Sequence, residues 1–129
     1  EGQRMNVYVA TRGNMVGFVL TGIHNKPYLF KAFQTETTDP QAQITLATQR
    51  AVAFARANEV KYAGYSINLY SDYSADINKL IGNEYLSRFN YQIRQKGVRT
   101  EEEKQRMLLA ETTIAMELNR QWIRNQKQR

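Results

Sequence analysis

The sequence contains no cysteine and a single histidine, His24. Without thiols the chain can form neither disulfide bridges nor a thiolate metal site, and the redox compartment stays open. His24 has no Cys or Asp at the spacing of a zinc site or a catalytic triad. We therefore expect His24 to be an exposed polar residue in the turn before Pro27.

Long apolar runs are also missing. No run approaches the roughly 18 residues that span a membrane, and the first four residues lack the apolar stretch of a signal peptide. We expect no membrane contact, and a location in the cytoplasm or in association with nucleic acid. The first residue is Glu rather than Met, which leaves open whether the chain is part of a longer protein.

Acidic residues are outnumbered by basic ones. Eighteen Lys and Arg against 12 Asp and Glu give a formal charge of +6, which favours encounter with polyanions such as nucleic acid. The excess is concentrated in residues 88–99 and 120–129, which contain basic side chains and no acids. A solvated helix face with a cationic tail explains the same pattern, so charge alone leaves both interpretations open.

The first third of the chain has the pattern of a β-meander. Three alternating or apolar segments, residues 5–10, 15–23 and 28–37, are separated by turn residues and predict consecutive antiparallel strands. With 129 residues, 42% of them hydrophobic, the chain has the size of one domain. We assign this domain to residues 1–123 and treat residues 124–129 as a basic polar tail.

A helix and a fourth strand are predicted next. Asp39 or Thr38 can cap a helix that reaches about Asn58, and Pro40 suits its first position. Apolar residues recur there every three or four positions. Residues 66–71 alternate as a strand. The helical crossover lets this strand pair parallel to an earlier one, so the predicted fold class is α/β with a mixed sheet.

The C-terminal third has helical periodicity. Two short helices are expected to end near Gly82 and Gly97, with no fifth strand before Thr100. A last helix is expected from Thr100 to Ile123, because Thr100 begins the T-x-x-E pattern of a capping box.

This order of elements, and three short segments within it, resemble the ribonuclease H superfamily over about residues 5–82. Residues 6–13 resemble the family's first strand and its T-D-G turn, and residues 38–43 resemble the loop before the helix that bears the catalytic Glu. Residues 67–72 resemble the fourth strand with its terminal Y-[ST]-D. The resemblance implies a ribonuclease H-like sheet followed by C-terminal helices.

The resemblance also implies a degenerate active site. Active members hold two divalent metal ions with a cluster of carboxylates. The first-strand Asp falls at Thr11 and the helix Glu at Gln43, so only the fourth-strand acid is retained, as Asp72. Glu103 and Glu111 are the candidates for the family's final acid. We expect no catalytic residues and no metal cofactor, and Asp72 is more simply interpreted as a helix cap or turn former.

Nucleic-acid contacts are expected elsewhere on the domain. In the family, a basic region after the fourth strand contacts the phosphate backbone, and residues 85–99 resemble it. The cations that we expect to contact phosphate are Arg12, Arg88, Arg94, Lys96 and Arg99. The tyrosines of this region either stack on bases or fill a seam between helices and sheet; they are Tyr62, Tyr65, Tyr70, Tyr73, Tyr85 and Tyr91.

Three functions remain open. The leading hypothesis is a catalytically degenerate domain that acts as a nucleic-acid-binding or architectural module in a larger protein or assembly. The second is a Mg²⁺-dependent nuclease with carboxylates rearranged around Asp72, drawn from Asp39, Asp76 or Glu111. The third is an interaction domain whose last helix docks a protein partner or a second copy through Trp122 and Ile123.

Overall fold

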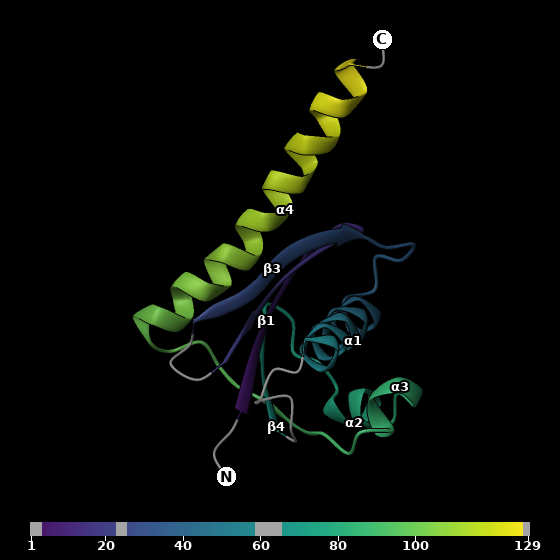
Figure 1. The fold of residues 1–129 in the computed structure, drawn as a ribbon, viewed down its shortest axis with the longest axis vertical. Coiled ribbons are helices and arrows are strands. Elements are labelled where there is room, and N and C mark those ends of the chain that lie inside the picture. The colour runs from purple at the N-terminus through teal and green to yellow at the C-terminus, as the bar shows by residue number, and fades with distance from the viewer. Residues whose placement is uncertain (1–3, 23–25, 59–65, 128–129) are drawn as a thin grey trace.

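A computed structural model describes residues 4–22, 26–58 and 66–127. They form a five-stranded mixed sheet of order β3-β2-β1-β4-β5 with helices on both faces (Figure 1). The elements in chain order are β1 (Arg4–Arg12), β2 (Met15–Thr21), β3 (Pro27–Gln34), α1 (Pro40–Ala57), β4 (Ser66–Ser71), α2 (Ile77–Ile81), α3 (Glu84–Ser87), β5 (Gln92–Gln95) and α4 (Glu101–Lys127).

The predicted meander is confirmed. β1 and β2 pair antiparallel up to Arg12 opposite Met15, so the hairpin closes through a two-residue turn. Gly13 in that turn has φ +59, a conformation that most side chains avoid and glycine adopts freely. β2 pairs antiparallel with β3, and β4 pairs parallel with β1 after the α1 crossover.

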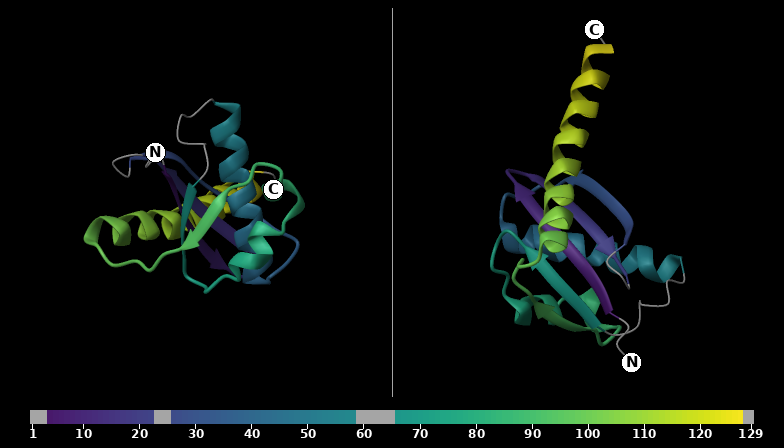
Figure 2. Two further views of the ribbon diagram at one scale, coloured as in Figure 1. Left: turned by 90° about the horizontal axis from the view of Figure 1, so that it is seen from below. Right: turned by 90° about the vertical axis from the view of Figure 1, so that its left-hand side faces the viewer.

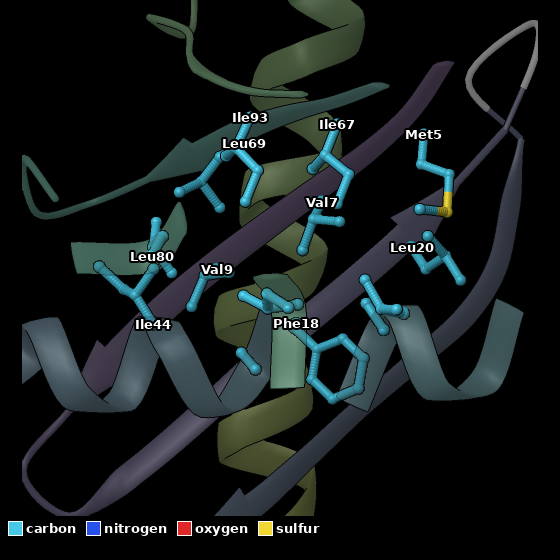
Figure 3. Close-up of a cluster of buried hydrophobic side chains, with 14 of the residues drawn as sticks. Met5, Val7, Val9, Phe18, Leu20, Ile44, Ile67, Leu69, Leu80 and Ile93 are labelled. Carbon is cyan, nitrogen blue, oxygen red and sulfur yellow. The ribbon is translucent and has the colours of Figure 1, made fainter. Parts of the chain in front are cut away.

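Helices cover the sheet on both sides (Figures 1 and 2). α1 packs on one face with α2 and α3 beside it, and α4 packs on the other. Both faces of β1 are therefore buried: Val7 and Val9 face α1, whereas Tyr8 and Ala10 face α4. Figure 3 shows the α1-side core, in which side chains of four strands meet the helix.

Burial on both faces also explains the apolar run in β2. All seven of its residues are buried, because Phe18 and Leu20 face α1 while Met15 and Val19 face α4. None of the helices in the described part of the chain has the length and apolarity that would let it cross a membrane.

The prediction for residues 83–97 was wrong in one respect. The expected second helix is only α3, and the chain then turns at Asn90, with φ 55, into a fifth strand, β5. β5 pairs parallel with β4, placing Ile93 opposite Ile67. Leu86, Phe89 and Ile93 have helical spacing by coincidence, since Ile93 is buried by sheet pairing rather than by a helix.

The final helix is longer than predicted. α4 begins after Thr100 as expected but continues beyond Ile123 to Lys127. Residues 124–127, predicted to belong to a polar tail, are therefore helical and exposed.

Gly17 on β2 allows α4 to lie close to the sheet. A Cβ built on Gly17 would collide with the backbone oxygen of Ala110 and would lie 2.5 Å from the Thr113 hydroxyl oxygen. Because the nearest atom belongs to the backbone of α4, a side chain at residue 17 fits only if the whole helix shifts away from the sheet.

We predict that Gly17→Ala lowers the free energy of unfolding by about 1–3 kcal/mol, the usual cost of overpacking. Urea unfolding followed by far-UV circular dichroism measures this. Gly97→Ala is the control, because only the distant Nε of Arg99, at 3.9 Å, lies near a Cβ there. Equal stability of the two variants would contradict the close approach.

Candidate functional site

The carboxyl ends of β1, β4 and β5 lie at one edge of the sheet, because these three strands are parallel. Val9 is opposite Ser71, so the residues that follow each strand become neighbours. The Thr11 backbone N–H donates to Asp72 Oδ2 at 2.9 Å, and the Thr11 hydroxyl donates to Oδ1 at 3.2 Å. The structure thus brings together two of the three positions that sequence reasoning singled out.

Asp72 does not cap a helix, so one of the two expectations for it was wrong; it lies in the bend after β4. The caps of α1, α2 and α3 are Asp39, Asp76 and Asn83, each of which accepts from a backbone N–H in the first turn. The carboxylate of Asp72 instead joins the ends of β1 and β4, with both oxygens held by Thr11.

Gln43 has a different set of partners. It is fully buried in the first turn of α1, and its Nε2 donates to the carbonyls of Gly13 at 2.9 Å and Thr37 at 3.0 Å. The hydroxyl oxygen of Thr35 lies 3.2 Å from the same nitrogen. The amide therefore ties α1 to the β1–β2 turn and to the β3–α1 loop. A carboxylate in this orientation would face carbonyl oxygens, which repel it.

Glu103 is one of the two candidates for the final acid that the resemblance implies. Its carboxylate is hydrogen-bonded at the start of α4. The predicted capping box is present: Glu103 N–H donates to the Thr100 hydroxyl at 3.1 Å, and Thr100 N–H donates to Glu103 Oε1 at 3.0 Å. Arg99 N–H also donates to Oε1 at 2.9 Å, and the Tyr70 hydroxyl donates to Oε2 at 2.9 Å.

These contacts change two proton affinities. Partial burial would raise the pKa of Glu103, but hydrogen bonds from the backbone of Thr100 and Arg99 and from Tyr70 outweigh it and lower the pKa. Burial, followed by the hydrogen bond to Glu103, raises the pKa of the Tyr70 hydroxyl. Both shifts favour the pair in which Glu103 is ionised and Tyr70 keeps its proton.

The residues present do not fit a two-metal centre. Asp72 is bound by Thr11, Asp39 and Asp76 cap separate helices, and Glu111 lies two turns beyond Glu103 on α4. Across residues 4–22, 26–58 and 66–127, no group of three or more His, Cys, Asp or Glu could hold a metal ion.

Three of the predicted phosphate-binding cations line one hollow between the end of β5 and the start of α4. We call it the basic hollow; its lining residues are Arg94, Gln95, Lys96, Gly97, Arg99, Thr100 and Glu103. Arg12 is exposed at the β1–β2 turn, at the same edge of the sheet. Arg88 is exposed at the C-cap of α3 and does not line the hollow.

Sequence reasoning missed Gln95, because it missed β5. Gln95 Nε2 donates to the Leu69 carbonyl at 3.3 Å and lies 3.2 Å from the Ser71 hydroxyl oxygen, while its Oε1 accepts from Ala75 N–H at 3.4 Å. The side chain thus fastens β5 to the end of β4, beside Asp72.

Several of the tyrosines pack inside the domain. Tyr70 stacks on Tyr8 with ring centroids 4.4 Å apart, and Tyr85 and Tyr91 both pack against Phe89. These contacts match the interpretation that they fill seams, whereas Tyr73 is 43% exposed. Tyr62, Tyr65 and His24 lie outside the described residues.

Solved structures share this arrangement of elements. LC11-RNase H1 in complex with an RNA/DNA hybrid matches 90% of this chain and 99% of its own, with 14% identity and a TM-score of 0.56. LC11-RNase H1 isolated from compost by a metagenomic approach matches 90% and 97%, with 13% identity and a TM-score of 0.53. RNase H1 from the halophilic archaeon Halobacterium salinarum NRC-1 matches 88% and 97%, with 18% identity and a TM-score of 0.49.

The chain therefore has a ribonuclease H-like fold. No protein-family model and no curated protein sequence matches it.

Gln43→Glu, which places an acid where the resemblance expects one, is predicted to destabilise the domain rather than to create a site. An uncompensated buried charge costs about 3–5 kcal/mol. Burial raises the folded pKa of the new carboxyl above its unfolded value, so the cost is absent at pH values below the unfolded pKa, about 4.3, and grows as the pH rises. Urea titrations at several pH values measure it, with the exposed Gln92→Glu as control. A pH-independent stability equal to that of the control would contradict the role of Gln43.

Glu103→Gln is predicted to remove about 0.3–1 kcal/mol of stability at neutral pH, because Gln can keep the hydrogen bond of the capping box but loses the negative charge at the helix N-terminus. Because the folded pKa of Glu103 is lowered, its contribution is present above its ordinary pKa of 4.5 and is lost as the pH falls through the folded value. The gap between wild type and variant should therefore shrink in acid. Glu36→Gln, at an exposed loop position, should show no such gap, and a gap for Glu103→Gln that persisted at low pH would refute the mechanism.

Proposed function

We propose that this domain binds the phosphate backbone of nucleic acid at the carboxyl edge of β1, β4 and β5, without cleaving it. The observation that carries the proposal is that Asp72 is hydrogen-bonded twice to Thr11 beside the basic hollow. In a nuclease this edge would hold metal ions. Here it carries the carboxylate of Asp72, hydrogen-bonded to Thr11, and three cations, Arg94, Lys96 and Arg99.

Electrostatics argue against catalysis at this edge. Two Mg²⁺ ions bring four positive charges and require anionic oxygen ligands. Thr11 and Gln43 contribute no charge, and Asp72 already accepts two hydrogen bonds. A metal ion at Asp72 would have no second carboxylate from β1 or α1, where Thr11 and Gln43 stand.

Electrostatics favour phosphate at the same edge. Arg94, Lys96 and Arg99 line one hollow with a single acid, Glu103, whose charge is directed at backbone N–H groups of the α4 start. Arg12 extends the basic surface along the edge, and Arg88 is a further contact candidate on α3. The LC11 ribonuclease H1 that shares the fold was solved with an RNA/DNA hybrid, which supports nucleic acid as the ligand class.

A domain that binds nucleic acid without cleaving it acts by holding the nucleic acid in position. We therefore propose an architectural role within a larger protein or assembly that handles nucleic acid. The rearranged-nuclease alternative requires Asp39, Asp76 or Glu111 to join Asp72. It has less support, because Asp39 and Asp76 are hydrogen-bonded to the backbone of the helices that they cap.

The test is a salt titration of binding to duplex DNA and to RNA/DNA hybrid. Each phosphate contact contributes about −0.9 to the slope of log affinity against log salt for a duplex. The triple variant Arg94→Gln/Lys96→Gln/Arg99→Gln should therefore flatten the slope by about 2–3. Lys31→Gln is the control, since exposed Lys31 lies in the middle of β3, the strand of the sheet that is farthest from β5.

Absent binding at low salt, or equal slopes for the triple variant and the control, would refute the proposed surface. Cleavage is measured in parallel with Mg²⁺ and with Mn²⁺. Metal-dependent cleavage by wild type that disappears in Asp72→Ala would establish the nuclease alternative instead.

A further inference from the structure

The outward side of α4 carries a continuous uncharged face. Nine exposed residues follow one another there at spacings of one, three or four, from the second turn of the helix to its last. This uncharged face consists of Gln105, Leu108, Thr112, Ala115, Met116, Asn119, Trp122, Ile123 and Gln126. Between Gln105 and Gln126 the charged residues of α4 lie on its other faces, and Glu101, one turn before Gln105, is the charge at the start of this strip.

The face contains large apolar side chains. Leu108 is 59% exposed, Met116 49%, Trp122 61% and Ile123 42%. Leu108, Trp122 and Ile123 lie away from the residues that α4 buries against the sheet, whereas Met116 lies at the flank of the helix, beside β3. The buried residues are Met107, Ala110, Thr113 and Ile114. Aromatic and Met side chains with depleted charge are the composition of a protein interface core.

The second half of α4 has little support from its own domain, since Met116, Glu117 and Arg120 only border a hollow beside β3. No residue from Ala115 to Lys127 is buried, and this half extends past the sheet (Figures 1 and 2). Helices gain most of their stability from packing an apolar face, and thirteen residues are marginal by themselves. A partner along the uncharged face would supply the missing packing.

We propose that two copies of this chain associate through an antiparallel pair of α4 helices, packed along the uncharged face. The charges of α4 favour this orientation: residues 101–117 contain five acids and two bases, whereas residues 118–127 contain three bases and no acid. Antiparallel packing places the acidic half of one helix beside the basic half of the other, and opposes the two helix dipoles. Parallel packing would bring like-charged halves together.

The geometry of the face suits a two-fold axis. Its midpoint falls between Ala115 and Met116, where the small alanine permits close approach of the helices. In this pair the second half of each α4 lies on the half of the other that its own sheet anchors. Residues 105–126 span roughly 32 Å of helix, enough length for a continuous interface.

Cysteine cross-linking tests the pair directly, because the chain has no cysteine of its own. Ala115→Cys lies at the proposed axis, so it should form a disulfide dimer with itself. Gln105→Cys and Gln126→Cys should each fail to cross-link alone, since equal positions would lie roughly 30 Å apart, but should cross-link when mixed. Self-linking of either end variant would mean parallel packing and would overturn the proposal.

Sedimentation velocity without nucleic acid gives the independent readout. Wild type should show a mass that rises with concentration towards the dimer. Met116→Glu places two like charges at the axis and should weaken association at least tenfold, whereas the exposed Asn125→Glu, off the uncharged face, should not. A wild type that stays monomeric at the highest concentration reached, or a dimer unaffected by Met116→Glu, would refute the interface, and circular dichroism verifies that each variant is folded.

Discussion

Parallel pairing of β1 with β4 is the constraint on which the candidate site depends. It places Val9 opposite Ser71, so that both strands end at one edge and Thr11 meets Asp72. In a nuclease of this fold, such proximity concentrates negative charge that metal ions balance. Here the carboxylate of Asp72 accepts two hydrogen bonds from Thr11, and neither Thr11 nor Gln43 adds a second negative charge.

The same replacement of charge by hydrogen bonding recurs around this edge. Gln43 stabilises the first turn of α1 by donating to the carbonyls of Gly13 and Thr37, which an acid could not do. Glu103 keeps its charge but uses it to cap α4 and to accept from Tyr70. Gln43 and Glu103 are thus part of the framework of the domain.

α4 links the two proposed surfaces. Its first turn borders the basic hollow through Thr100 and Glu103, while its outward side forms the uncharged face. An antiparallel pair of α4 helices would set two basic hollows at opposite ends of the helix pair, free to engage one long polyanion or two. The helix continues well beyond the sheet, which a monomeric binding domain does not require.

The sequence by itself determined the order of strands and helices up to β4 and the capping box at Thr100, and it limited the cap of α1 to Thr38 or Asp39. It also has neutral residues, Thr11 and Gln43, where the resemblance to ribonuclease H expects acids. These features are local: alternation, helical spacing and capping depend on neighbours within a few residues. Only the tertiary structure decided β5, because four residues alternating beside a short helix carry too little pattern, and pairing with β4 supplies their stability. It likewise decided that Asp72 binds Thr11 rather than capping a helix, since that contact joins residues 61 positions apart whose proximity exists only once the parallel sheet has formed.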